Sequence, residues 1–227
     1  MTDQSPTDLG TVWVTGQRRQ SNGTFPSRGG GGGGSAGGPV QRELEEEEPE
    51  EPQGQIDPCA DPETARIWSA DAAAARAVAA LAAKAASLND GSNLSNREFG
   101  ANLYLGAAGQ VELTEIDVGP EAVVGEVPEV EILPHGTTYQ NWMGDIHNHP
   151  SGDGRLSANE RNQFNARIDR MLRDLPWRTE ALALAAYVVV LDPSSPHGYR
   201  IFAHTRHTDA DQLGKEVNPD AQPCPIL

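Results

Sequence analysis

The sequence has no apolar run that approaches the roughly 20 residues of a membrane-spanning helix, and it does not begin with a basic segment followed by an apolar one. We therefore expect no ordinary export signal and a cytoplasmic protein, unless a specialised secretion or phage-like system exports it. Basic residues are also few, because 17 Lys and Arg stand against 33 Asp and Glu, for a formal net charge of −16. This charge disfavours nucleic acid and anionic membranes as partners.

Cysteine is scarce as well, with only Cys59 and Cys224 in the chain. A disulfide between them would join the two ends of the folded part in an oxidising environment, and two free thiols are the equal alternative. Neither cysteine has a second cysteine or a histidine at the short spacing of a zinc knuckle, so we do not expect them to bind metal. The glycine run over residues 29–34 is not followed by the Gly-Lys-Ser/Thr of a phosphate-binding loop, so we expect it to be a flexible tether.

The composition divides the chain into an arm, a domain and a tail. Residues 1–57 hold 10 acidic and 4 basic residues together with the glycine run, and they have almost no consecutive apolar residues. Such a segment cannot bury enough surface to offset its chain entropy, so we expect a disordered arm, which could bind a tether or delivery partner. We expect one folded domain over residues 58–206 and a loose C-terminal tail over residues 207–227.

The pattern of the domain predicts both helices and strands. Asp61 followed by Pro62 predicts the start of an alanine-rich helix that runs to about Ser87. Apolar segments on both sides of the turn at residues 106–109 predict a hairpin. The expected hairpin strands are 99–105 and 111–116, followed by an edge strand or extended loop over 118–133, strands over 142–147, 181–191 and 199–204, and a helix from 157 to about 175. This order predicts an α/β (α+β) fold with a mixed sheet flanked by helices.

One segment carries a candidate metal site. His147 and His149 lie two residues apart at the end of a predicted strand, so their side chains point to the same face of the sheet. A turn rich in proline and glycine follows, and a helix begins at Ser157, so Glu160 in its first turn can fold back toward the histidines. Two neutral imidazoles and one carboxylate are typical protein ligands of a catalytic zinc, with a fourth position left for water.

Each half of this pattern also has an ordinary structural explanation. Ser157 and Glu160 have the spacing of a capping box, in which the two residues satisfy the first backbone groups of a helix. A His-x-His pair near a strand end is commonly structural. The combination of both features, joined by a single loop, favours the metal site.

The same residues resemble the signature of the JAMM (also called JAB or MPN-plus) metalloproteases. That signature has a distant glutamate, then His-x-His-Pro, and then Ser-x-x-Asp after seven residues counted from the second histidine. His147, His149 and Ser157 match it, and Glu160 stands where the family has aspartate. The segment His-Asn-His-Pro-Ser-Gly-Asp that begins at His147 also resembles RadC-type proteins. The resemblance implies a JAMM/JAB-like fold, which is related to that of cytidine deaminases.

The resemblance also implies a mechanism and a cofactor. Glu98, about fifty residues upstream in a Glu-Phe-Gly segment, matches the distant glutamate and would be the general base. Zn²⁺ would be the cofactor, held by His147, His149 and Glu160, and Ser157 would donate a hydrogen bond to the oxyanion. The expected reaction is hydrolysis of a peptide or isopeptide bond in a peptide or protein substrate. Two alternatives stay open, namely a metal-free, degenerate JAB-like binding module and a RadC-like nucleic-acid-processing protein, which the acidic charge disfavours.

Other polar residues near the motif have less specific interpretations. Asp145 shares a face with His147, so it could orient an imidazole or be a solvated acid at a strand end. Asn148 and Asp153 are expected to build the turn. The remaining histidines have no partner at ligand spacing, and we expect them to be ordinary loop or strand residues: His135, His197, His204 and His207.

Overall fold

The computed structural model describes residues 17–19, 57, 59–122 and 126–224. Apart from residues 17–19 and 57, the predicted disordered arm lies outside the described residues. Among the described residues, no helix combines the length and the apolar character needed to cross a bilayer. The elements are β1 (Gln17–Arg19), α1 (Pro62–Ser87), β2 (Phe99–Leu105), β3 (Val111–Leu113), β4 (Asp117–Val118), β5 (Glu126–Pro128), β6 (Trp142–Asn148), α2 (Ala158–Asp174), the 3₁₀ helix η1 (Thr179–Ala183), β7 (Ala185–Leu191), β8 (Tyr199–His204) and β9 (Lys215–Glu216).

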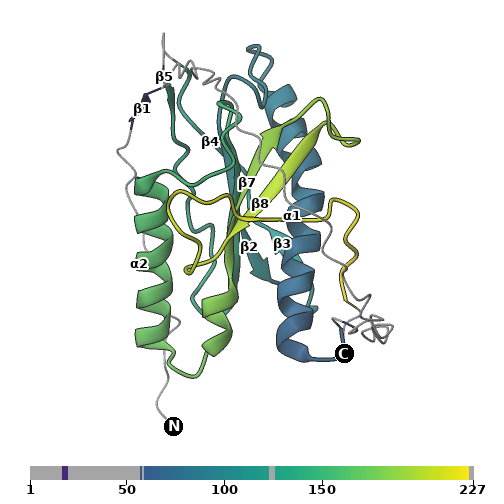
Figure 1. Cartoon of the computed structure of the whole chain (residues 1–227), viewed down its shortest axis with the longest axis vertical. Helices are drawn as coiled ribbons and strands as arrows, with labels where there is room; N and C mark the ends of the chain where they lie inside the picture. Colours follow the sequence, from purple (N-terminus) through teal and green to yellow (C-terminus); the bar gives the residue numbers. More distant parts are fainter. Residues whose placement is uncertain (1–16, 20–56, 58, 123–125, 225–227) are drawn as a thin grey trace, which may run out of the picture. The chain divides into compact units, whose positions relative to one another are not determined.

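Most of the strands form one open, mixed sheet. Its order is β3-β2-β6-β7-β8-β9, and β4 pairs with β2 outside this path. Strands β6 and β7 run parallel and are connected through α2 and η1, whereas the other pairs in the sheet are antiparallel. Strand β1 pairs separately with β5. Figure 1 shows α1 and α2 on opposite sides of the sheet, which confirms the predicted α/β fold with a mixed sheet and flanking helices.

Helix α1 forms where its capping residues predict. The Asp61 side chain accepts a hydrogen bond from the Thr64 N–H at 2.8 Å, and Pro62 occupies the first turn. Most of the buried residues of α1 are alanines, which allow the helix to approach the sheet closely. Within this interface the hydroxyl of Tyr187 donates to the buried carboxylate of Asp71 at 2.8 Å. The helix is therefore joined to β7 by a buried polar contact as well as by apolar packing.

The register of the strands assigns the polar residues of the motif to one face of the sheet. His147 of β6 pairs with Gly100 of β2 and with Val188 of β7. Val188 in turn pairs with Phe202 of β8. Paired residues share a face, and so do residues two apart along a strand. The face that carries His147 therefore also carries Glu98, Asp145, Phe202 and His204.

The apolar run that begins at Ala181 is not one continuous strand. Residues Thr179–Ala183 form η1, and β7 begins only at Ala185. Ala181 and Leu184 are buried in the 3₁₀ turn, so a helical turn hides their apolar surface as well as a strand would. Over residues 118–133, only the short β4 and β5 are strands among the described residues, so the extended-loop alternative describes most of this segment.

The predicted loose tail is in part incorporated into the domain. Lys215–Glu216 forms β9 at the edge of the sheet, and Val217 and Ala221 are buried. Beyond β9, Cys224 forms a disulfide with Cys59, across a sequence separation of 165 residues. Of the two alternatives for the cysteines, the structure contains the disulfide, which fastens the C-terminal segment close to the start of α1.

Candidate metal centre

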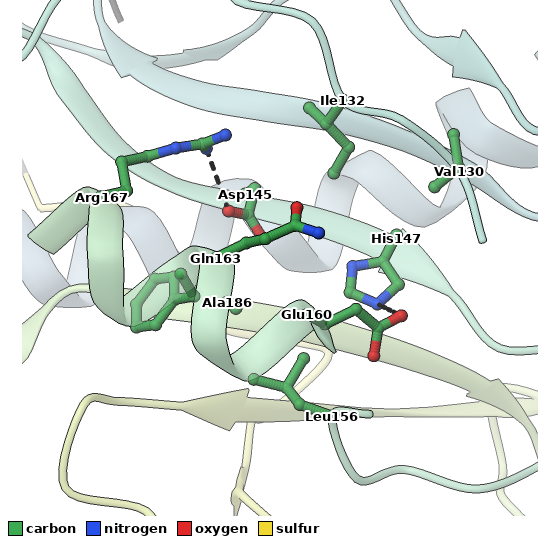
Figure 2. A pocket seen from close by; sticks show the side chains of 10 residues that line it. Val130, Ile132, Asp145, His147, Leu156, Glu160, Gln163, Arg167 and Ala186 are labelled. Carbon is green, nitrogen blue, oxygen red and sulfur yellow. Dashed lines mark hydrogen bonds and ion pairs between the residues drawn. The ribbon is translucent and has the colours of Figure 1, made fainter. Parts of the chain in front are cut away.

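The structure brings the three predicted metal ligands together. The Nε2 atoms of His147 and His149 lie 2.9 Å apart. Glu160 Oε1 lies 3.3 Å from Nε2 of His147 and 3.1 Å from Nε2 of His149. All ligand atoms of this group fall within 4.8 Å of one another, and both histidines are buried. Figure 2 shows the side chains of His147 and Glu160 pointing toward each other from β6 and α2. Two imidazole nitrogens and one carboxylate oxygen therefore converge on a single point, as a zinc site requires.

The strand end and the following turn explain how this convergence arises. Alternation along β6 puts His147 and His149 on the same face, and the backbone N–H of His149 still donates to the Val189 carbonyl at 2.8 Å. The chain then turns at Gly152, whose φ of +72° favours glycine. Helix α2 begins directly after this loop, so its first turn faces the end of β6.

Glu160 makes two sets of contacts at once, so the capping box and the candidate metal site do not exclude each other. Its Oε2 accepts from the Ser157 N–H at 2.6 Å, and its own N–H donates to Ser157 Oγ at 3.1 Å. These two contacts form the predicted capping box. The other oxygen, Oε1, points to the two histidines. The cap therefore fixes the carboxylate in the orientation in which it would bind a metal.

The tautomer of His149 is fixed by a backbone carbonyl. Its Nδ1 lies 2.7 Å from the carbonyl oxygen of Asp153, which can only accept a hydrogen bond, so Nδ1 carries the proton. In the neutral ring, this leaves the lone pair on Nε2, directed at the cluster. A metal-bound histidine commonly donates its other ring N–H to such a carbonyl. Asp153 therefore contributes more than the turn that the sequence indicated.

The electrostatics of the cluster favour a positive charge at its centre. Burial by itself lowers the pKa of His147, but the carboxylates of Glu160, Glu98 and Asp145 outweigh it and raise this pKa to about 9. Burial likewise raises the pKa of Glu160, yet the contacts with His147 and His149 lower it well below its usual range. Without a metal, a proton on His147 supplies the positive charge. A divalent cation would replace that proton at the same three atoms.

Glu98 lies beside the cluster, and its carboxylate is not one of the three converging groups. Its side chain is almost fully buried, and Oε2 accepts from the Val130 N–H at 3.0 Å. Its charge acts on His147, whose pKa it raises. This position, on the same face of the sheet as the histidines, would suit a residue that takes up a proton beside a bound metal ion.

Sequence reasoning missed the function of Asn148, which was expected only to build the turn. Its Oδ1 accepts from the Phe99 N–H at 2.8 Å, and its Nδ2 donates to the carbonyls of Leu94 and Arg97 at 2.9 and 3.0 Å. These three contacts hold the backbone on both sides of Glu98. The signal was present in the alternation of the motif, because the residue between two same-face histidines must project toward the opposite face.

Ser157 and Asp145 have different relations to the cluster. The Ser157 hydroxyl accepts from the Glu160 N–H, so that hydrogen bond does not use the hydroxyl's own proton. Asp145 was considered as a residue that orients an imidazole, but its carboxylate pairs with Arg167 at 3.3 Å. Burial raises the pKa of Asp145, and the charges of Arg167 and His147 oppose this shift.

A small cavity adjoins the cluster. Its volume is about 40 Å³, and Figure 2 shows the side chains around it, with His147 and Glu160 near one end and the Asp145–Arg167 pair near the other. Val130, Ile132 and Leu156 contribute apolar walls. A cavity of this size can hold a few water molecules, so water can reach the ligand atoms of the cluster.

Comparison with known proteins does not assign this chain to a family. No protein-family model matches the chain, and searches of the curated proteins and of the solved structures found no match either. The chemistry of the site is therefore inferred from its own residues.

Proposed function

We propose that the protein is a zinc-dependent hydrolase of peptide or isopeptide bonds, with the JAMM/JAB-like site that the sequence motif resembles. The observation that supports this most strongly is the buried convergence of His147, His149 and Glu160, with Glu98 beside it on the same face of the sheet. The three residues would hold the ion. When bound there, zinc would lower the pKa of a coordinated water molecule toward neutrality and would polarise the substrate carbonyl.

The residues around the ion would carry the proton and orient the substrate. Glu98 would accept a proton from the attacking water and return it to the amine that leaves as the amide bond breaks. Ser157 would donate its hydroxyl proton in a hydrogen bond to the oxyanion that develops on the substrate carbonyl. The cavity beside His147 would admit substrate atoms next to the cluster. The substrate would be a peptide or a protein segment.

Cleavage of peptide substrates by the zinc-loaded protein tests this proposal. We expect Glu98→Gln to retain zinc and to lose activity by about 10²- to 10⁴-fold, because the amide cannot accept a proton. Glu115→Gln makes the same chemical change at an exposed position outside the site and should leave the rate unchanged. Equal activity of Glu98→Gln and the wild type would refute Glu98 as the base. Absence of cleavage over a broad peptide library by a protein that binds zinc would refute the peptidase function.

One observation favours a second candidate, the metal-free binding module. The raised pKa of His147 and the lowered pKa of Glu160 describe an ion pair that balances the charge of the buried cluster without a metal. A binding module could therefore keep these residues for stability alone. Zinc binding distinguishes the two functions, because the module would show no site that depends on His147 and His149.

A further inference from the structure

His204 is a buried histidine that the proposed mechanism does not use. It lies at the end of β8, is completely inaccessible to solvent, and shares the sheet face of His147. Its Nε2 lies 2.7 Å from the carbonyl oxygen of Gly154, so Nε2 carries a proton and donates it. Its Nδ1 is buried without a hydrogen-bond partner among the described residues.

The carbonyl that His204 holds is next to the one that orients His149. Asp153 O accepts from His149 Nδ1 at 2.7 Å, and the following carbonyl, Gly154 O, accepts from His204 Nε2 at 2.7 Å. Because consecutive peptide groups are rigid and covalently joined, a displacement of Gly154 moves the carbonyl of Asp153 as well. His204 of β8 and His149, which follows β6, are therefore connected through two adjacent backbone carbonyls.

Strand β8 also supports this loop by packing. A Cβ atom at Gly154 would overlap the ring of Phe202, so the loop backbone lies directly against that side chain. Phe202 and His204 are two residues apart on β8 and point to the same face. Asp153, in turn, binds Arg155 through its carboxylate. The loop is thus held from β8 by one ring contact and one hydrogen bond.

From this arrangement we propose that His204 is a positioning residue of the metal centre, which fixes the Asp153 carbonyl and thereby the orientation of His149. This inference rests on the proposed zinc site. His204 does not belong to the converging ligand group, and it contacts the loop through its hydrogen bond to Gly154 O. Loss of that bond removes one of the two contacts through which β8 holds the loop, so His149 is less well oriented before zinc binds. The Asp153 carbonyl contacts a metal ligand directly, and loss of such a contact typically changes metal affinity by about 10- to 100-fold.

The test compares zinc affinities of full-length variants, measured by competition with a chromophoric chelator. His204→Leu removes the donor to Gly154 O and should weaken zinc binding by about tenfold, the lower end of the range for a direct partner of a metal ligand, because His204 acts through the adjoining peptide group. His204→Gln keeps an amide donor at a reach similar to that of Nε2, so the hydrogen bond to Gly154 O survives. Its zinc affinity should stay within about threefold of the wild-type value. His204→Asn carries the same amide on a shorter side chain that cannot reach Gly154, so it should weaken binding as His204→Leu does. The comparison of His204→Gln with His204→Asn decides the question even if His204→Leu does not fold.

Tyr187→Phe is the matched control. It removes a buried hydrogen bond on a neighbouring strand, but on the face of the sheet that contacts α1. It should lower the free energy of unfolding without changing zinc affinity. Unchanged zinc affinity in His204→Leu and His204→Asn would overturn the positioning function while leaving the zinc site intact. A loss of zinc affinity in Tyr187→Phe as large as that in His204→Leu would also overturn it. A wild-type protein that binds no zinc would overturn the proposed zinc site, and this inference with it.

Discussion

Asn148→Ala should be among the most destabilising substitutions of a polar residue in this protein. The side chain is 1% exposed and makes three hydrogen bonds to the backbone, at 2.8, 2.9 and 3.0 Å. Truncation removes the side-chain partner of one N–H and two carbonyls. Each buried group left unpaired costs about 1–3 kcal/mol, and two of the three contacts are buried, so we expect a loss of about 2–6 kcal/mol. That is a large fraction of the roughly 5–15 kcal/mol that stabilises a typical domain.

Urea denaturation, monitored by tryptophan fluorescence, measures this loss of stability. Asn162→Ala is the matched control, because Asn162 is exposed on α2. The control should change the free energy of unfolding by less than about 0.5 kcal/mol. Asn148→Asp should be about as harmful as Asn148→Ala, because it keeps the acceptor for the Phe99 N–H but places a carboxylate oxygen against two carbonyls. A loss below about 1 kcal/mol in Asn148→Ala would refute the claim that this side chain holds the segment around Glu98.

Four further predictions concern the disulfide, two glycines and the buried ion pair. Reduction of the Cys59–Cys224 disulfide should lower the free energy of unfolding by about 2–5 kcal/mol, because the disulfide closes a loop of 165 residues. Detection of two reactive thiols in the untreated native protein would contradict the presence of this disulfide. Gly144→Ala should cost about 2–5 kcal/mol in urea denaturation, because φ at this residue is +137° and a Cβ would overlap a backbone carbonyl of β7. Gly152→Ala, which has a positive φ but open space around it, should cost about 1 kcal/mol. The metal-free protein should lose stability as the pH rises from about 6.5, the pKa of an unperturbed histidine, through about 9, the pKa of His147 in the folded state. The midpoint of urea denaturation should therefore fall across this pH range. A midpoint that does not change with pH would contradict the ion pair between His147 and Glu160.

Local features of the sequence were sufficient to predict many of the elements. Asp61 and Pro62 mark the start of α1, and Ser157 marks the start of α2, because capping depends on residues close in sequence. The hairpin of β2 and β3 depends on one short turn and forms as predicted. Its second strand covers residues 111–113, which is shorter than the predicted 111–116. Most of the strand predicted over 181–191 is β7, but its first residues, 181–183, belong to η1. They were misassigned because short apolar segments have no periodicity that separates a strand from a helical turn.

The candidate site was predictable where its residues are neighbours in sequence. His147, His149 and Glu160 lie within one strand–loop–helix unit, so alternation and a helix start were enough to bring them together. Glu98 could be selected only through the family resemblance, because its position depends on the register in which Gly100 pairs with His147. His204 depends on a pairing across two further strand boundaries, which no local pattern encodes.

The most direct test of the proposed metal centre is a titration of the metal-free protein with zinc, measured by isothermal titration calorimetry. We expect about one zinc per chain in the wild type, and loss of that site in His147→Ala, His149→Ala and Glu160→Ala. His197→Ala, at an exposed histidine in the turn between β7 and β8, should bind zinc as the wild type does. A wild type without a stoichiometric site, or a His147→Ala variant that binds zinc with unchanged affinity, would contradict the metal centre.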